Sequence, residues 1–541
     1  MNMSLPIVGI TLEGFQVFNE PTYIPLDRLT LLFGPNSAGK SSISDALKLY
    51  EQLLNIEPRA REIDPSLNLY DLPGETYRSR FSLYEEILPD LIDRHWRRLG
   101  GNADELVAEM GIAVVHTVDN SIDDYSIERQ FAGETQRKLL IEPSYSQPII
   151  LENSWRFVRD ESRLAFSYSL KIQSEFVVDY VDTTIRINLQ HPFLRSIEKR
   201  VDFAAAALAY PKELSFEDGI FTVKAGVFGF HPSGRDINRK GSNWLAYAPL
   251  EDLGADPQLR SLLNQTLGEL SLLIGHLMDF LNRSKSFLPE TVAASRTVPT
   301  RADMILSFVD DSIAAPLKGH LPTGNTFYES LARSLISAPS DQKLADGVNR
   351  ALSDHLFLDQ GYRIDASLWT LSSANPKAVA YDEAAEIVEL FLRDGYGSRH
   401  QFEDVGSGIG YVLPVLCALF DHQHCFIQQP ELHLHPALQA AMGDVLIEAV
   451  KVAIGVKQIL VETHSEHLLL RILKRIRQTH LQVNIAPELK ITSDDVCVLY
   501  FDPSPDGTTT VKRLRITEDG EFMDRWPRGF FSERDQELLD E

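Results

Sequence analysis

The chain has 541 residues, of which 44% are hydrophobic and 24% are charged, a composition typical of a globular protein with two or three domains. Acidic residues outnumber basic ones, 77 to 52, and the formal net charge of −25 argues against general binding of nucleic acid by the surface. Three separated cysteines exclude a disulfide framework. We see no secretory leader and no apolar run of about 18 residues, so we expect a cytoplasmic protein without membrane contact.

The N-terminal part contains a phosphate-binding loop between an expected strand and an expected helix. Residues 29–33 are apolar and predict a buried strand, and apolar residues at helical spacing follow from residue 43. The loop fits the pattern GxxxxGK[ST] and consists of Gly34, Pro35, Asn36, Ser37, Ala38, Gly39, Lys40 and Ser41. Backbone N–H groups at a helix N-terminus attract phosphate, Lys40 can reach the β and γ oxygens, and the Ser41 hydroxyl suits Mg²⁺. We therefore predict an ATP and Mg²⁺ site that includes this loop and Ser42.

The middle of the chain combines strand and helix patterns. Hydrophobic alternation in residues 164–172 and 185–189 predicts strands within a strand-rich region, 135–230. Gly, Pro, Ser and Asn predict a loop at 229–256, and apolar residues three and four apart predict a helix at 257–283. Further helices are expected within 56–125, at 326–357 and at 382–393.

Beyond residue 400 the pattern becomes a series of alternating strands and helices. Strands are expected at 424–427, 458–461, 496–501 and 509–516, and helices at 411–420, 436–453 and 466–477. Pro436 is well placed to open the second helix. We therefore predict an α/β P-loop NTPase head built from both chain ends, residues 1–55 and 400–541, with 56–399 inserted as a β-rich and helical module.

Three C-terminal segments resemble the rest of a cassette ATPase site. Residues 405–410, the signature segment, place Ser407 and Gly408 at a helix N-terminus, and residues 426–436 read FIQQPELHLHP. The latter resembles the Walker B segment and D-loop of ATP-binding-cassette (ABC) ATPases of the RecF and overcoming-lysogenization-defect type. Residues 461–467, VETHSEH, resemble the switch segment whose histidine, here His464, contacts the γ-phosphate. The resemblance assigns catalytic positions to Gln428, Gln429, Glu431 and His464.

The Walker B segment departs from the family at one position. Residue 428 is usually a carboxylate near the metal, but here it is Gln428, and Gln429 follows. Glutamine is neutral and is not a general base, so the metal ligands expected from the resemblance, Ser41 and Gln428, carry no charge. Either the chain is a slow ATPase that uses ATP as a clamp, or the glutamine replaces a glutamate and traps ATP. Glu431 and Glu462 remain as carboxylates for positioning water.

The resemblance implies a function based on ATP-dependent assembly. Two heads would sandwich ATP between the phosphate loop of one subunit and residues 407–410 of the other. The ending at 524–531, DRWPRGFF, resembles a bacterial subset that serves in antiviral islands, such as the PtuA ATPases of Septu and certain retrons. The implied role is regulation of an effector such as an HNH nuclease, with nucleic acid bound through that partner.

Two alternative functions stay open. One is a RecF-like DNA-repair ATPase that binds DNA directly, with these residues as the candidate contacts: Arg296, Arg301, Arg471, Lys474, Arg475, Arg477, Lys512, Arg513 and Arg515. The other is a scaffold that binds ATP without turnover. Salt-dependent DNA binding and phosphate release are the measurements that separate these readings.

Overall fold

The computed structural model describes residues 7–55, 106–116, 149–160, 163–172, 175–181, 184–191, 194, 201–224, 228–230, 245–247, 257–268, 270, 289–308, 326–371, 385–452 and 457–527. The chain forms two compact units. Unit 1 comprises Met1–Leu26, Ser42–Leu288 and Pro503–Val511, and unit 2 comprises Asp27–Ser41, Pro289–Asp502 and Lys512–Glu541. The predicted division at residues 55 and 399 is a division of the sequence and stays a prediction.

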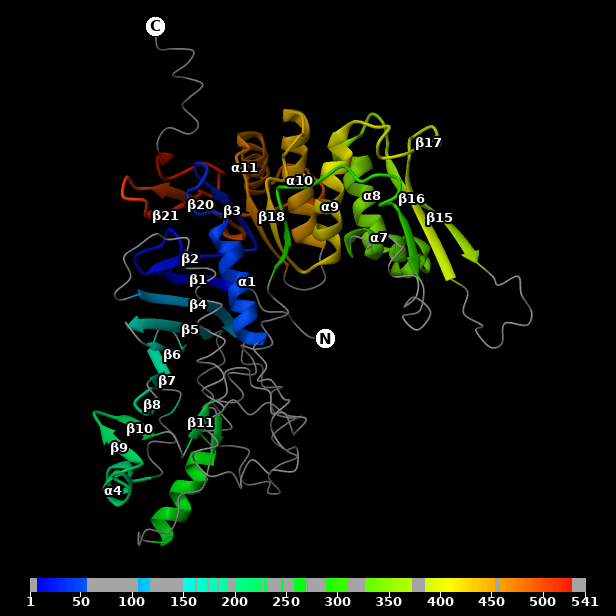
Figure 1. Ribbon diagram of the computed structural model, residues 1–541. Helices are drawn as coiled ribbons and strands as arrows, with labels where there is room; N and C mark the ends of the chain where they lie inside the picture. Colours follow the sequence, from blue (N-terminus) through cyan, green and yellow to red (C-terminus); the bar gives the residue numbers. More distant parts are fainter. Residues whose placement is uncertain are drawn as a thin grey trace, which may run out of the picture. The chain divides into compact units, whose positions relative to one another are not determined.

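Unit 1 is built on a nine-stranded antiparallel sheet with the order β2-β1-β4-β5-β6-β7-β8-β10-β9 (Figure 1). Its strands are β1 Ile7–Glu13, β2 Thr22–Pro25, β4 Leu106–His116, β5 Ile149–Asp160, β6 Arg163–Ile172, β7 Glu175–Val181, β8 Thr184–Asn188, β9 Leu214–Glu217 and β10 Ile220–Lys224. The unit also contains helices α1, Ser42–Asn55, and α4, Phe203–Ala209. The predicted alternation is confirmed, since Leu170, Ile172, Ile185 and Ile187 are buried on β6 and β8.

Two expectations for this part of the chain are corrected. Residues 106–116 form β4, although helices were expected within 56–125. The expected loop at 229–256 contains two short paired strands, β11 (Phe228–Phe230) and β12 (Leu245–Tyr247). In both cases backbone pairing with a distant strand overrides weak local preferences. The helix expected at 257–283 is confirmed for residues 257–268, and residues 271–283 lie outside the described part.

Unit 2 contains a six-stranded sheet with the order β13-β18-β19-β3-β20-β21. Its strands are β13 Glu290–Val292, β18 His424–Gln428, β19 Gln458–Glu462, β3 Leu29–Phe33, β20 Val496–Pro503 and β21 Thr509–Leu514. β3 pairs in parallel with β19 on one side and with β20 on the other. A strand from the N-terminal part is thus enclosed by C-terminal strands, and the predicted α/β P-loop head built from both chain ends is confirmed.

The burial of these strands explains their composition. Every residue of β3 is buried, as are the first four of β18 and of β19, because helices cover a parallel sheet. The covering helices α9 (Ser407–Asp421), α10 (Pro436–Val452) and α11 (Glu466–His480) lie side by side in Figure 1. α10 begins at the predicted proline, and the Ser465 side chain caps α11 by accepting a hydrogen bond from Leu468 N.

A second, antiparallel sheet of unit 2 consists of β14 (Ile305–Phe308), β15 (Arg363–Leu371), β16 (Ala385–Arg393) and β17 (Arg399–His400). This part of unit 2 also contains helices α7 (Thr326–Ile336) and α8 (Lys343–Arg350) and a π-helical turn, η9 (Ala351–Leu356). These elements confirm the helices expected at 326–357. The helix expected at 382–393 is wrong for residues 385–393, which form β16, and residues 382–384 lie outside the described part. β16 is the central strand, and a short apolar run buried on both faces does not distinguish a strand from a helix.

Among the described residues, no helix has the length and apolar character needed to cross a membrane.

Candidate nucleotide site

The phosphate loop follows β3 directly and has the backbone conformations that its glycines permit. Gly34 has φ +142°, and a Cβ atom there would lie 2.5 Å from the carbonyl oxygen of Phe501 on β20. Gly39 has φ +89°, and Ser37 also lies in the left-handed region at +63°. Asn36 and Ser37 are exposed, whereas Ala38 is buried. The loop is therefore packed on the sheet at one end and open to solvent at its tip.

Lys40 is the buried cation of the site. Its ammonium donates hydrogen bonds to the carbonyl oxygens of Gly34 and Pro35, both at 2.9 Å, and lies 3.8 Å from the Glu462 carboxylate. Burial lowers the pKa of Lys40, and the charges of Glu462 and Glu431 oppose this shift. The bonds hold the positive charge within the loop, and the next residue, Ser41, is exposed.

Gln428 and Glu462 end two neighbouring parallel strands and face each other in register. Gln428 Nε2 donates to Glu462 Oε2 at 3.3 Å, and Gln428 Oε1 accepts from Ala294 N at 3.3 Å. Burial raises the pKa of Glu462, while Lys40 and the amide of Gln428 act against the rise. The carboxylate of Glu462, at the end of β19, thus lies beside the neutral Gln428 at the end of β18.

Glu431 and His464 form the second polar pair. Glu431 Oε1 accepts a hydrogen bond from His464 N at 2.8 Å, and burial raises the pKa of this carboxyl. Burial, and then the charge of Lys40, lowers the pKa of His464. Within the described part of the chain, Glu431 Oε2 and His464 Nε2 are buried and have no hydrogen-bond partner. Such groups are suited to binding a polar ligand, because they have unused hydrogen-bonding capacity.

The signature segment opens α9. Gly406 is the N-cap, Ser407 is exposed, and residues 407–410 form the first helical turn. The D-loop packs against this turn, since the His433 ring stacks on Tyr411 at 4.1 Å between centroids and Leu434 lies beside Gly408. These contacts give His433 a packing role in the described structure.

Apart from the other residues of the phosphate loop, the predicted site residues lie in four places. Lys40, Gln428, Glu431 and His464 converge at the carboxyl ends of β3, β18 and β19, together with Glu462. Ser407 and Gly408 lie on α9 as an exposed turn. Ser42 belongs to unit 1, where its hydroxyl donates to Gln16 Oε1 and where Gln16 Nε2 also donates to Asp45, so it is already engaged by protein. Gln429 contributes through its backbone, because its carbonyl oxygen accepts a hydrogen bond from Arg296.

Arg296 lies beside the site and holds its backbone, a role that the sequence analysis did not predict. We considered it as a contact for nucleic acid, but its guanidinium donates to backbone carbonyls of Ala293, Tyr411, Gln428 and Gln429. It follows β13, which pairs in parallel with β18. The only signal in the sequence was an arginine after a short apolar run, which does not reveal its partners.

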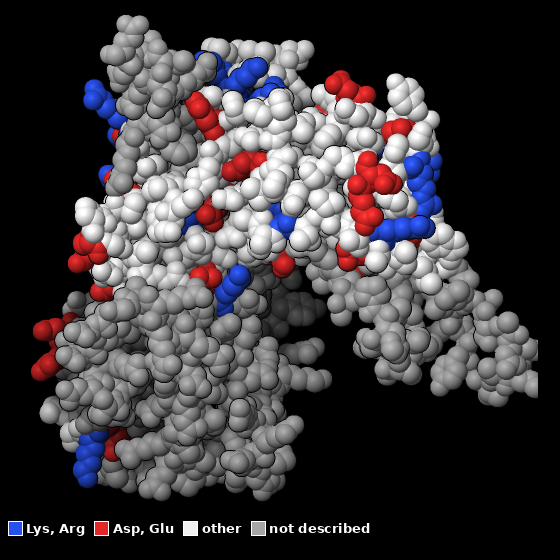
Figure 2. All heavy atoms as spheres, turned by 45° about the horizontal axis from the view of Figure 1, so that its top comes forward, with Lys and Arg blue, Asp and Glu red and all other residues white. Residues whose placement is uncertain are grey.

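Seven of the eight other basic candidates form ion pairs, whereas Lys474 is exposed and has no ion pair among the described residues. Arg301 pairs with Glu389, and Arg471 and Arg475 both pair with the buried Asp444. The remaining pairs are Arg477 with Glu521, Lys512 with Asp502, Arg513 with Asp27 and Arg515 with Asp524. Figure 2 shows basic groups beside acidic groups on the described surface. Such pairing weakens attraction for phosphate backbones.

The residues present fit a nucleoside triphosphate with Mg²⁺. Lys40 and the glycine-permitted loop suit a phosphate chain, and Glu431 Oε2 and His464 Nε2, which have no partner among the described residues, suit a polar ligand. The Ser41 hydroxyl and the Glu462 carboxylate are oxygen donors of the kind that Mg²⁺ prefers. Gln428 as a metal ligand stays a prediction.

The comparisons with known proteins give a short family match and distant structural likenesses. The family model described as "Protein of unknown function (DUF3696)" matches residues 491–540. No match was found among the curated proteins. A solved SMC head domain from Thermotoga maritima is 11% identical, with 95% of this chain and 100% of that chain covered and a TM-score of 0.32.

A second solved structure is the Smc head domain of Pyrococcus furiosus with an extended coiled coil, bound to the C-terminal domain of ScpA. It is 13% identical, with 94% of this chain and 96% of that chain covered and a TM-score of 0.34. These identities and TM-scores are too low to carry an argument about function.

Proposed function

We propose that the chain is a cassette-type ATPase that binds MgATP in unit 2 and self-associates around it. The observation that carries this proposal is the convergence of Lys40, Glu462, Gln428, Glu431 and His464 at the ends of three adjacent parallel strands. Phosphate-binding sites of P-loop proteins are built at such an edge, where the loop and the strand ends meet.

The residues of this cluster have different roles in binding and hydrolysing the nucleotide. Lys40 supplies the positive charge for the phosphate chain, and His464 supplies a neutral imidazole, because burial and Lys40 both lower its pKa. MgATP would supply the phosphoryl group and the cation that offsets its charge. Glu431 is the best-placed base for water among the described residues, because burial raises the pKa of its carboxyl and the carboxylate lies next to His464.

A non-hydrolysing clamp is a second candidate, favoured by Gln428 and Gln429. Neither side chain is a carboxylate, and Gln428 is hydrogen-bonded to Glu462 instead of presenting a charge of its own. The direct DNA-binding alternative receives no support from the basic candidates that form ion pairs.

The effector role rests on the resemblance of the motifs and the tail. We propose that the assembled ATPase regulates a partner in anti-phage defence, with an HNH nuclease as the expected class of partner. Co-purification of the chain with a nuclease encoded by a neighbouring reading frame, and its dependence on ATP, tests this part.

Replacement of the loop lysine tests the core of the proposal. Lys40→Ala removes the buried ammonium, so ATP affinity should fall at least about 10-fold, equivalent to about 1.4 kcal/mol. Lys48→Ala is the matched control, because Lys48 is an exposed lysine on the adjoining helix. Isothermal titration of both variants with MgATP measures the effect. Equal affinity of Lys40→Ala and the parent would refute the nucleotide site.

A further inference from the structure

Arg296 joins three separate segments of unit 2 through backbone carbonyls. Its Nε donates to Tyr411 O at 3.1 Å, Nη1 donates to Ala293 O at 2.9 Å and to Gln428 O at 2.7 Å, and Nη2 donates to Gln429 O at 2.6 Å. Arginine has five N–H donors in a planar arrangement, and this contact uses four of them. Burial lowers the pKa of Arg296, and the nearby carboxylate of Glu431 opposes this shift.

One side of this contact controls the turn after the Walker B strand. Gln429 has φ +48°, a conformation that costs a non-glycine residue on the order of 1 kcal/mol. Two hydrogen bonds hold it there, from Arg296 to Gln429 O and from Gln429 N to Glu462 O at 2.7 Å. The turn leads into Glu431, which accepts from the backbone of His464. Arg296 therefore contributes to the position of the Glu431 carboxylate.

The other side of the contact reaches the signature helix. Tyr411, whose carbonyl oxygen accepts from Arg296, lies four residues after Ser407 on α9 and stacks on His433. Gly410 is packed so closely on the same loop that a Cβ atom there would lie 2.7 Å from Val298 Cγ1. The start of α9 and the Walker B turn are thus attached to one loop, residues 293–299.

We propose that Arg296 is a positioning residue that couples the nucleotide at Lys40 to the exposed signature turn at Ser407, and so makes self-association depend on ATP. The proposal rests on the proposed function. A shift of the Walker B turn on nucleotide binding is passed to α9 because the two carbonyl groups of residues 428 and 429 and that of Tyr411 share one rigid guanidinium. The ammonium of a lysine cannot replace it, because its single nitrogen lacks the planar spread of the three guanidinium nitrogens.

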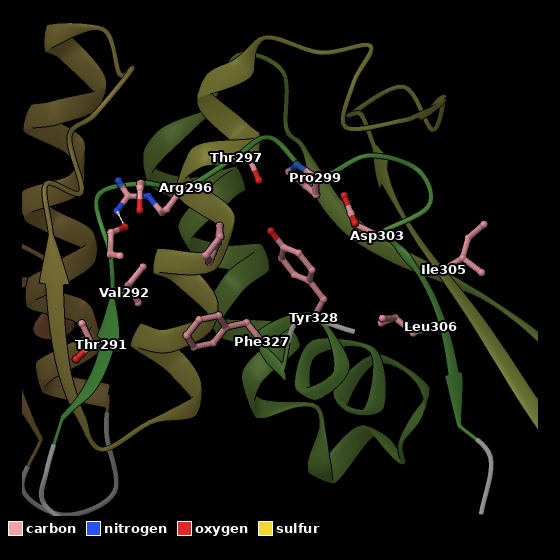
Figure 3. Close-up of a pocket in the computed structure, with 13 residues that line it drawn as sticks. Thr291, Val292, Arg296, Thr297, Pro299, Asp303, Ile305, Leu306, Phe327 and Tyr328 are labelled. Carbon is pink, nitrogen blue, oxygen red and sulfur yellow. Dashed lines mark hydrogen bonds between the residues drawn. The ribbon is translucent and has the colours of Figure 1, made fainter. Parts of the chain in front are cut away.

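A cavity beside Arg296 makes this coupling chemically testable. The cavity has a volume of about 300 Å³ and is lined by Arg296, Thr297, Phe327, Tyr328 and Pro414, among others. Figure 3 shows Arg296 at one end of it, near Val292, with Asp303 and Ile305 toward the other end. Truncation of Arg296 would enlarge this space, so that guanidinium ion can enter and occupy the place of the lost side-chain group.

The experiment compares ATP affinity and ATP-dependent mass in Arg296→Ala, Arg296→Lys and the control Arg301→Ala. Arg301 is 62% exposed and pairs with Glu389, away from the four carbonyls. We expect both Arg296 variants to keep ATP affinity within about 3-fold of the parent, while the ATP-dependent association constant falls at least about 10-fold. Millimolar guanidinium should restore association in Arg296→Ala alone. Arg301→Ala should behave as the parent.

The possible outcomes test the coupling through Arg296 and the proposed ATP site separately. Parent-like, ATP-dependent association of either Arg296 variant would overturn the coupling and leave the ATP site standing. Joint loss of ATP affinity and association in both variants would overturn it as well, because Arg296 would then only support the fold of the site. Absence of ATP binding by the parent would overturn the proposed function itself. If Arg296→Ala does not fold, Arg296→Lys decides by the same comparison.

Discussion

Gln428 Nε2 donates a hydrogen bond to Glu462 Oε2 at 3.3 Å, across two parallel strands whose last residues pair in register. Gln428 and Glu462 therefore have one negative charge between them, on Glu462. This carboxylate also lies 3.8 Å from the Lys40 ammonium. A second carboxylate at residue 428 would face Glu462 directly and would need a cation between them.

This relationship predicts that residue 428 controls turnover. Gln428→Glu adds a carboxylate that favours Mg²⁺ and can act on water, so phosphate release should rise at least about 10-fold and depend more steeply on Mg²⁺. Phosphate release over a Mg²⁺ titration measures it. If Gln428→Glu releases phosphate as slowly as the parent, and Glu431→Gln does not change the rate either, the result supports the non-hydrolysing clamp.

The signature turn is predicted to act between subunits. Ser407 is exposed at the start of α9, so Ser407→Arg adds bulk and charge without disturbing Lys40. ATP affinity should stay within about 2-fold, whereas the ATP-dependent increase in mass should disappear. Sedimentation with and without ATP reads the effect, and Ser340→Arg, at another exposed serine, serves as control. The same ATP response in Ser407→Arg and the parent would exclude a role across the subunits.

Stability is predicted to fall in mild acid because of one buried histidine. Burial and the charge of Lys457 lower the pKa of His424 to about 4. The unfolded chain takes up the proton near the ordinary pKa of about 6.5, so stability is present above that pH and is lost as the pH falls toward 4. The free energy of unfolding should decrease by about 2 kcal/mol from about pH 7 to about pH 5 through this group.

Urea unfolding at both pH values checks this expectation. In His424→Gln the decrease should be smaller by that amount, because the side chain no longer titrates. His467→Gln removes an exposed histidine instead and should leave the pH dependence as it is in the parent. An unchanged pH dependence in His424→Gln would contradict the prediction.

The C-terminal segment is predicted to support the phosphate loop through Trp526. The indole lies edge-on to Phe33, the last residue before the loop, at 5.3 Å between ring centroids, and it also contacts Tyr500 and Phe522. Trp526→Ala should lower the free energy of unfolding by about 2 kcal/mol, and Trp526→Phe by less, because a ring remains. Trp369→Ala removes a tryptophan that is 46% exposed and should have little effect. Equal unfolding midpoints of Trp526→Ala and the parent would show that these ring contacts do not stabilise the loop.

Local patterns predicted much of unit 2 correctly. The phosphate loop occupies eight consecutive residues, and its strand and helix follow from short apolar patterns, so no distant contact is needed to recognise them. The same holds for β18, β19, α10 and α11, whose spacing and starting residues are visible in the sequence. The helix expected over β16 failed, because its state depends on pairing with β14 and β15 on either side.

The sequence by itself determined that the chain carries a phosphate-binding loop and that strands and helices alternate beyond residue 400, because both depend on residues close together in the chain. The joining of both ends into one sheet depends on the pairing of β3 with β19 and β20. Only the tertiary structure decided which carboxylate lies beside Lys40 and what Arg296 binds. Glu462 approaches Lys40 through the parallel pairing of β3 with β19, and Arg296 approaches Gln428 through that of β13 with β18. Every residue has a backbone carbonyl, so the sequence does not indicate which carbonyls accept hydrogen bonds from a distant arginine. Only the folded structure identifies them.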